Sequence, residues 1–243
     1  SDVNPLHTDN FEEVSFGPIL YGAKKLGMHI HTRYEVSNNA GQDICDIVNN
    51  EGFDFLLVGS GISMSDSPDD IAATRYRTSF YNRYFKRFKA PESWFYPGAL
   101  LKDKTKMFIA RSNCDVGVFI NRNFVKATNT LVVISSEEDL FLLDYTRTLL
   151  KATHGSVGIV AKMSTTTPGH DQILKELWDF VSSIPQTQLL PDKDLTPGLF
   201  NSYNFMLIGY NTWNDVSEHR KEALQKMPST LILNKNRRSS SDN

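Results

Sequence analysis

Asn-Cys-Asp-Val-Gly-Val-Phe-Ile-Asn-Arg, residues 113–122, is the stretch that decides the fold predicted for this chain. A short polar link over 123–129 separates it from a second apolar run, Thr-Leu-Val-Val-Ile at 130–134. The runs 116–120 and 131–134 are continuously apolar and rich in β-branched residues, which is typical of parallel strands covered on both faces. The pattern therefore predicts two buried strands and a division of the chain between them.

Helical and strand-like patterns alternate on both sides of this stretch. Such alternation is typical of a parallel α/β sheet. Residues 183–201 are rich in proline and are expected to form a loop. The predicted helices span 11–26, 42–50, 72–88, 137–151, 170–182 and 216–225, and the predicted strands span 28–36, 53–59, 116–120, 131–134, 155–163, 203–209 and 229–233.

Two of the predicted strands have the same sequence character. Phe-Asp-Phe-Leu-Leu-Val-Gly (53–59) and Tyr-Asn-Phe-Met-Leu-Ile-Gly (203–209) both run aromatic, Asp or Asn, Phe, three aliphatic residues and Gly. A repeat of this kind predicts a duplicated plan. The first copy lacks a counterpart of the strand at 131–134 before residue 11. That strand was either lost or lies upstream, and both alternatives stay open.

The repeat predicts where the chain divides. The expected parts are a linker at 1–10, a first lobe at 11–126 with an insertion at 62–111, a second lobe at 127–234 and a disordered tail at 235–243.

Composition argues against several function classes. A formal net charge of −2 gives no global attraction to nucleic acid, so no such partner is expected. Cys45 and Cys114 have no neighbouring Cys or His at zinc-ligand spacing, so no metal site is expected. The sequence contains no Gly-x-Ser-x-Gly elbow and no apolar run of about 20 residues. We therefore expect a soluble chain without catalytic activity.

Four segments, taken in order, resemble a known family. They are Gly-Gln-Asp-Ile-Cys-Asp-Ile (41–47), Phe-Leu-Leu-Val-Gly (55–59), the stretch 113–122 and Glu-Glu-Asp (137–139). They are similar to the cytoplasmic C-terminal region of the monovalent cation/proton antiporter-2 family, which includes the plant cation/proton exchangers and the fungal potassium/proton antiporter. The resemblance leans toward the fungal branch.

The stretch 113–122 is the most specific part of this resemblance. The family's form is Pro-Cys-Ser-Val-Gly-Ile-Leu-Val-Asp-Arg. Here Asn113 stands in place of Pro, Asp115 in place of Ser and Asn121 in place of Asp.

The resemblance implies an α/β fold. Two tandem universal-stress-protein-like lobes, each with a doubly wound and mainly parallel sheet, are expected to pack as a pseudo-dimer. Universal stress proteins commonly dimerise through their last strands, so 116–120 and 229–233 are expected to approach each other.

The resemblance also implies a function. The chain would be a soluble cytoplasmic regulatory or assembly domain of a multi-pass potassium(sodium)/proton antiporter, modulating cation/proton exchange and pH and potassium homeostasis. Its place would be the cytoplasmic face of an endomembrane, Golgi or late secretory and endosomal. Its partners would be the membrane domain of the same antiporter and a second copy of the chain. The alternative is a free-standing universal-stress-type protein that binds adenine nucleotide.

The candidate cofactor site is Gly59-Ser60-Gly61, directly after a predicted strand. The carboxyl ends of strands in doubly wound sheets bind phosphates. Universal stress proteins that bind ATP carry a spaced series of glycines there, of which only this Gly-x-Gly is present; the second copy keeps Gly209 alone. Adenine nucleotide is the candidate ligand, and a tight turn is the alternative.

The segment 75–88 interleaves basic and aromatic side chains. In one interpretation the aromatic side chains pack the insertion onto the sheet and the basic ones stay solvated. In the other, Arg75, Arg83 and Arg87 face anionic lipid or an acidic part of the membrane domain.

His29 and His31 lie two apart on a predicted strand and would face the same side. They are either sensors of pH between about 5 and 8 or ordinary structural histidines.

Overall fold

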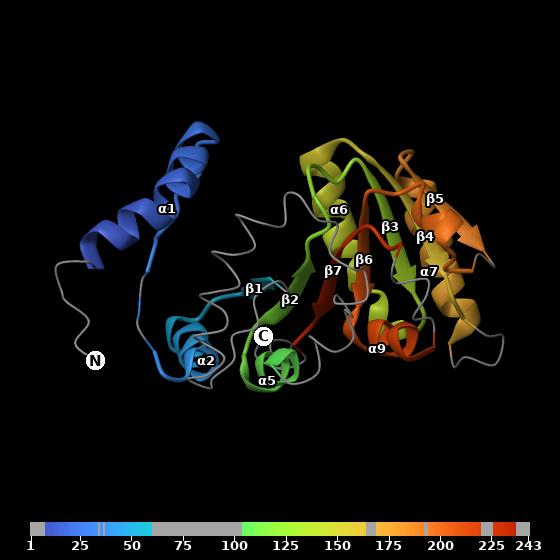
Figure 1. Cartoon of the computed structure of the whole chain (residues 1–243). Helices are drawn as coiled ribbons and strands as arrows, with labels where there is room; N and C mark the ends of the chain where they lie inside the picture. Colours follow the sequence, from blue (N-terminus) through green and yellow to red (C-terminus); the bar gives the residue numbers. More distant parts are fainter. Residues whose placement is uncertain are drawn as a thin grey trace. The chain divides into compact units, whose positions relative to one another are not determined.

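The computed structural model describes residues 8–33, 35, 37–59, 104–163, 169–191, 194–219 and 226–236 (Figure 1). Most of the predicted linker, insertion and tail lies outside these residues. The chain divides into two units, Ser1–Ala40 and Gly41–Asn243, and each is described by itself.

The described residues of the first unit form one helix and no strand. Helix α1 (Thr8–Lys25) confirms the predicted helix, and Gly27 follows it in the left-handed conformation at φ 67°, which ends many helices. The predicted strand at 28–36 is wrong over 28–33, which has no regular structure. An alternating pattern forms a strand only where a neighbouring strand pairs with its backbone. Among the described residues, none pairs with 28–33.

One seven-stranded sheet forms the centre of the second unit, in the order β1-β2-β7-β6-β3-β4-β5. All neighbouring strands are parallel except β2 and β7, which are antiparallel. We call this antiparallel pairing the seam. The strands are β1 (Phe55–Gly59), β2 (Asp115–Ile120), β3 (Asn129–Ile134), β4 (Ser156–Ala161), β5 (Thr187–Pro191), β6 (Phe205–Gly209) and β7 (Ser229–Asn234).

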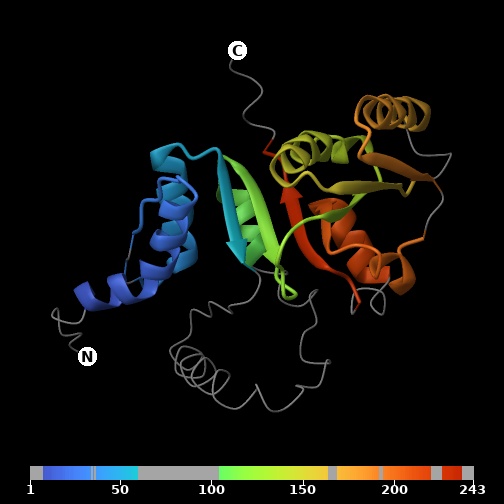
Figure 2. The ribbon, with the colours of Figure 1, turned by 90° about the horizontal axis from the view of Figure 1, so that it is seen from above.

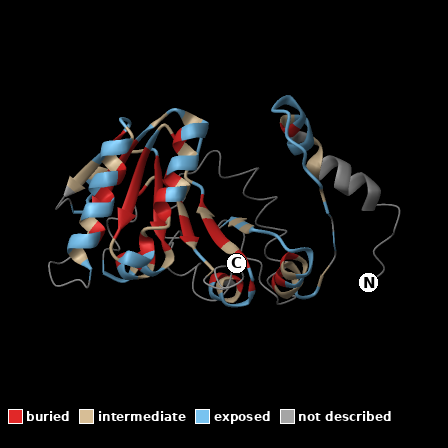
Figure 3. Ribbon diagram, turned by 180° about the vertical axis from the view of Figure 1, so that it is seen from behind, coloured by how far each residue is buried: buried red, intermediate tan, exposed pale blue. Residues whose placement is uncertain are grey.

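Helices cover both faces of this sheet (Figure 2). On one face, α6 (Leu142–Thr153) and α7 (His170–Ser183) pack over a core that includes Val132 and Ile134 of β3. On the other, α8 (Pro197–Phe200) and α9 (Tyr210–His219) pack over Leu131 and Val133. These four side chains of the apolar run are 0 % exposed, so the run does belong to a strand covered on both faces (Figure 3).

A smaller core lies beside β1 and β2. Cys45 of α2 (Ala40–Glu51), Phe108 of α5 (Lys104–Arg111) and Val116 of β2 form its buried centre. Each of these side chains is 5 % exposed or less. Helix α5 therefore fixes the last eight residues of the predicted insertion onto the sheet.

The expected approach of 116–120 to 229–233 is confirmed by the seam. Its register runs from Val116 opposite Asn234 to Ile120 opposite Thr230. The expectation of two separate lobes needs correction, because the described residues form one continuous sheet. Before β3 they contribute only β1 and β2, which extend the sheet of the later strands through the seam instead of forming a second doubly wound sheet.

The repeated strands β1 and β6 differ in burial. Each pairs in parallel with its partner strand, β1 with β2 and β6 with β7. However, β6 is central and Leu207 is 2 % exposed, whereas β1 is the edge of the described sheet and Leu57 is 58 % exposed. The same sequence pattern therefore serves two positions in the sheet.

Four parts of the fold differ from the predicted boundaries. Strand β5 and helix α8 lie within the stretch expected to be a loop, since β5 is a short edge strand that ends in Pro191. The helix expected at 137–151 is divided into the 3₁₀ turn η3 (Glu137–Asp139) and α6. Helix α9 begins at Tyr210, directly after β6, and not at 216.

Candidate functional site

The sheet reverses its winding between β3 and β6. From β3 the chain continues to β4 and β5 on one side, and β6 and β7 lie on the other. Doubly wound sheets bind ligands in the crevice at the carboxyl ends of the two strands where the order reverses. In this chain those ends are Ile134 and Gly209, so the candidate site lies there.

The carboxylate of Asp139 fills this crevice. The residue is 2 % exposed, and its Oδ2 accepts hydrogen bonds from the Ser135 N–H (2.8 Å), the Ser136 N–H (3.3 Å) and the Ser135 hydroxyl (3.1 Å). The hydroxyl of Thr212 in α9 donates a fourth bond of 2.6 Å. The two hydroxyls also lie within hydrogen-bonding distance of each other. Asp139 thus joins the end of β3 to α9.

Gly209 provides the space for this carboxylate. A Cβ at position 209 would overlap Asp139 Oδ1 and would lie 3.1 Å from its Cγ. Because α9 begins at Tyr210, no loop separates the end of β6 from the helix. Glycine at 209 is therefore required by close approach and not by a phosphate-binding turn.

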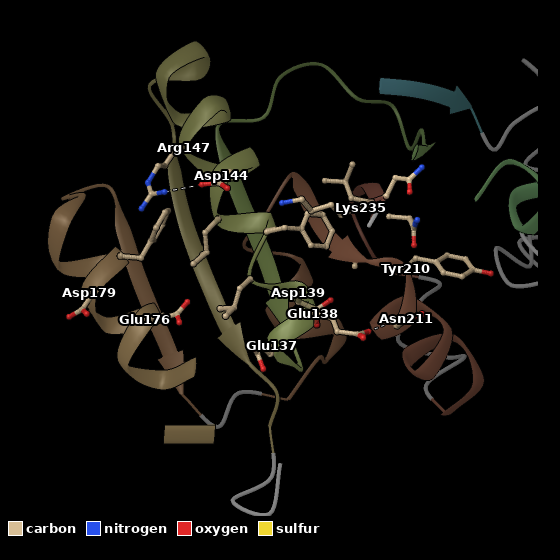
Figure 4. Close-up of a pocket in the computed structure, with 18 residues that line it drawn as sticks. Glu137, Glu138, Asp139, Asp144, Arg147, Glu176, Asp179, Tyr210, Asn211 and Lys235 are labelled. Atoms are coloured by element: carbon tan, nitrogen blue, oxygen red, sulfur yellow. Dashed lines mark hydrogen bonds and ion pairs between the residues drawn. The ribbon is translucent and has the colours of Figure 1, made fainter. Parts of the chain in front are cut away.

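A cleft of about 720 Å³ adjoins the crevice (Figure 4). Arg147 lies along it, pairing with Asp144 at 2.9 Å and placing its guanidinium 5.0 Å from the centre of the Phe180 ring. Six acidic residues line this cleft with only two basic ones, Arg147 and Lys235, so its lining carries a net negative charge. The acidic residues are Glu137, Glu138, Asp139, Asp144, Glu176 and Asp179.

The residues of this site do not fit the phosphates of an adenine nucleotide. The position between β3 and β6 already holds a carboxylate, and the cleft beside it carries a strong excess of negative charge. The backbone donors that could bind a phosphate, at Ser135 and Ser136, are bonded to Asp139. The fold therefore has the location of a nucleotide site without its chemistry.

The structure does not bring the predicted Gly59 to this crevice. Gly59 ends β1, which runs opposite to β3 and β6 because of the antiparallel seam. The carboxyl end of β1 therefore lies on the side of the sheet where β3 and β6 begin. Ser60 and Gly61 lie outside the described residues, and a nucleotide site there stays a prediction.

Two other sequence predictions concern the basic segment and the histidine pair. Arg75, Arg83 and Arg87 lie outside the described residues. His29 and His31 are exposed and lie in the first unit, on no strand, so the strand that would give them a common face is absent. Their role as pH sensors stays a prediction. Sequence analysis missed Asp139 and Thr212, and the signal that could have found Asp139 is a carboxylate three residues after Ser136, in the capping-box spacing.

A second polar cluster lies at the seam. The hydroxyl of Tyr145 in α6 donates to Asp115 Oδ2 at 2.8 Å, and the N–H of Asn236 donates to Asp115 Oδ1 at 2.8 Å. The Asn236 side-chain amide donates to the carbonyl of Ser112. Burial, followed by the hydrogen bond to Asp115 and the charge of that carboxylate, raises the pKa of Tyr145 well above its usual value.

The three departures in the stretch 113–122 all make hydrogen bonds. Asn113 donates its N–H to Asn49 Oδ1 of α2 at 2.7 Å, a bond that a proline at 113 could not make. Asp115 makes the two bonds at the seam. Asn121 Oδ1 accepts from the N–H of Phe124 at 2.9 Å. Each replacement therefore has a structural partner in this chain.

The described residues show neither a cluster of metal ligands nor a membrane-spanning helix. In that part of the chain, no three His, Cys, Asp or Glu side chains are grouped so that they could hold a metal ion. No described helix is both long and apolar enough to cross a membrane. Cys45 and Cys114 are buried and unpaired, and burial raises the pKa of both thiols.

Comparison with solved structures shows the fold. No family model and no curated protein matches the chain. A universal stress protein from Archaeoglobus fulgidus DSM 4304 superposes with a TM-score of 0.52 at 12% identity, covering 98% of this chain and 81% of that one. A candidate universal stress protein from Pseudomonas aeruginosa UCBPP-PA14 superposes with a TM-score of 0.48 at 10% identity, covering 93% and 79%. The chain has a universal-stress-protein-like fold.

Proposed function

We propose that this chain is a regulatory or assembly domain of a monovalent cation/proton antiporter, and that it has no catalytic activity of its own. In this proposal it modulates potassium(sodium)/proton exchange at the cytoplasmic face of an endomembrane. Its partner is the membrane domain of the same antiporter. The support is the resemblance of 113–122 to the antiporter-2 family together with the universal-stress-protein-like fold.

The observation that carries the proposal is the position of that stretch in the sheet. It forms β2, the strand at the seam, where Asp115 binds both Tyr145 of α6 and Asn236 after β7. The most specific part of the resemblance therefore lies where distant parts of the chain are joined, and not at a ligand-binding crevice. This position suits a regulatory or assembly role, in which the seam holds the joined parts of the chain together or transmits a change between them.

The pseudo-dimer is part of the proposal. We take β1 and β2 as the described remainder of a first lobe, equivalent to β6 and β7, and the seam as the contact between the two last strands. The antiparallel register of the seam and the matching parallel pairs on its two sides support this interpretation.

The alternative, a free-standing nucleotide-binding protein, has less support. The crevice between β3 and β6 is filled by Asp139 and adjoins an acidic cleft. No observation on the described residues favours nucleotide binding over regulation.

The test is cation/proton exchange in vesicles that carry the parent antiporter with and without residues 1–243. The seam is tested in the same assay with Asp115→Ala, and with Asp144→Ala, an exposed carboxylate of α6, as its matched control. We expect loss of the domain and Asp115→Ala to shift the exchange rate in the same direction, and Asp144→Ala to leave it unchanged. An exchange rate that is the same with and without the domain would refute the proposal.

Membrane contact through the basic segment remains a separate prediction. Flotation with anionic liposomes is expected to fall when Arg75, Arg83 and Arg87 are neutralised together. Equal flotation of both proteins would remove the lipid contact from the proposal.

A further inference from the structure

Asp139 is a buried carboxylate held by neutral donors. Among the described residues no lysine, arginine or histidine forms an ion pair with it. Two backbone N–H groups and two hydroxyls converge on Oδ2 instead, from Ser135, Ser136 and Thr212. Proteins bind phosphate and other small oxyanions with donors of this kind.

These donors lie at the place where the fold receives a ligand's anionic group. Ser135 and Ser136 directly follow β3, and Thr212 lies in the first turn of α9, after β6. The crevice between these strands is the switch point of the sheet. Gly209 leaves room for one oxygen of the anion, because a Cβ there would overlap Asp139 Oδ1.

We infer that Asp139 is a built-in anion, which occupies the phosphate position of the fold and excludes external phosphate from it. The ligand class of the underlying site is a small oxyanion such as inorganic phosphate. This inference does not rest on the antiporter proposal, because it concerns only the contacts of the second unit.

The inference separates two roles that Asp139 could have. As an ordinary capping residue, it would only satisfy the backbone at the start of η3, and its loss would lower stability in every buffer. If Asp139 instead occupies an anion site, its removal would leave four converging donors that a small oxyanion can satisfy. The decisive readout is therefore stabilisation of an Asp139 variant by phosphate and not by chloride.

The experiment compares the full chain 1–243 with its Asp139→Ala variant. Thermal unfolding followed by circular dichroism is measured in sodium phosphate and in sodium chloride of equal ionic strength. A calorimetric titration with inorganic phosphate follows. Glu137→Ala is the matched control, since Glu137 is an exposed acid of the same turn, two residues away. Phosphate is used alone because the adjoining cleft is acidic and would repel a nucleotide's larger charge.

We expect the midpoint of thermal unfolding of Asp139→Ala to rise with phosphate concentration, by mass action, and to be higher than in chloride of equal ionic strength. Its dissociation constant for phosphate should be about tenfold or more below that of the wild type and of Glu137→Ala. Adding Thr212→Val, which removes one donor, should weaken phosphate binding by the variant. Phosphate binding by the wild type equal to that by Asp139→Ala would overturn the inference, as would a variant whose midpoint is the same in both salts.

A failure of Asp139→Ala to fold in chloride is also informative. The unfolded variant is then titrated with phosphate and, separately, with formate, which supplies the missing carboxylate. Recovery of the native circular dichroism spectrum with either anion supports the inference. If neither phosphate nor formate restores the native spectrum, the inference is overturned, because the four donors would then not form an anion site.

Discussion

Tyr145 donates a hydrogen bond of 2.8 Å to Asp115, and this bond joins helix α6 to the first residue of β2. The other carboxylate oxygen of Asp115 accepts the N–H of Asn236, just after β7. One side chain thus holds three segments that are distant in the sequence. The seam therefore depends on polar side-chain contacts as well as on its backbone ladder.

Removing this contact should destabilise the chain. Tyr145→Phe deletes one hydrogen bond to a charged acceptor in a half-buried place, so we expect the free energy of unfolding to fall by about 1–2 kcal/mol. Asp115→Ala loses both bonds and should lower it by about 2–3 kcal/mol. Urea unfolding measures both. Tyr210→Phe is the matched control, since Tyr210 is also half-buried, and it should change the free energy of unfolding by less than about 0.5 kcal/mol. Equal stability of Tyr145→Phe and the wild type would contradict the role of the bond.

The raised pKa of Tyr145 predicts a loss of stability at high pH. An unfolded tyrosine loses its proton near pH 10, whereas folded Tyr145 keeps it. Between pH 10 and the folded pKa the folded state therefore holds one proton more, and the free energy of unfolding falls by up to about 1.4 kcal/mol per pH unit. Below pH 10 the contribution is present in full. The free energies of unfolding of the wild type and of Tyr145→Phe should differ by a constant amount up to pH 10 and converge above it. A difference that stays constant through pH 11 would be evidence against the shift.

Gly209→Ala should be unfavourable because its Cβ overlaps the Asp139 carboxylate. Overpacking of this kind costs about 1–3 kcal/mol. Gly198→Ala is the control, since a Cβ there would meet only Thr196 Oγ1 at 3.9 Å. In an Asp139→Ala background the penalty of Gly209→Ala should shrink, because the overlapping oxygen is gone. Penalties that simply add in the double variant would show that the two residues are not in contact.

The repeated strands predict a pair of unequal substitutions. Leu207→Ala, in the central strand β6, should lower the free energy of unfolding by about 2–5 kcal/mol. Leu57→Ala, at the matching position of the edge strand β1, should lower it by less than about 1 kcal/mol because Leu57 is 58 % exposed. Chemical unfolding of the two variants gives the comparison directly. A similar loss in both would mean that β1 is covered in solution.

Much of the fold follows from local patterns along the chain. The apolar runs at 116–120 and 131–134 predict buried strands because their side chains are unfavourable in water on either face. The amphipathic helices and the match between 53–59 and 203–209 are equally local. The expected pairing of 116–120 with 229–233 came from the resemblance, and the seam confirms it.

Other features depend on contacts that local patterns do not encode. The residues 28–33 have an alternating pattern but no neighbouring strand among the described residues, so they do not form the predicted strand. Strand β5 has a weak pattern and exists because β4 pairs with it. The nucleotide site was sought after β1, whereas the reversal of the sheet lies between β3 and β6.

The sequence alone determined the α/β class, the strand at each apolar run and the repeat, since these depend on the side chains of neighbouring residues. Only the tertiary structure decided that the described strands form one sheet, that Leu57 is exposed where Leu207 is buried, and that Asp139 fills the crevice beside Gly209. The physical reason is distance along the chain. Asp139, Gly209 and Thr212 meet because strand order places β3 next to β6, and strand order is a property of the folded sheet.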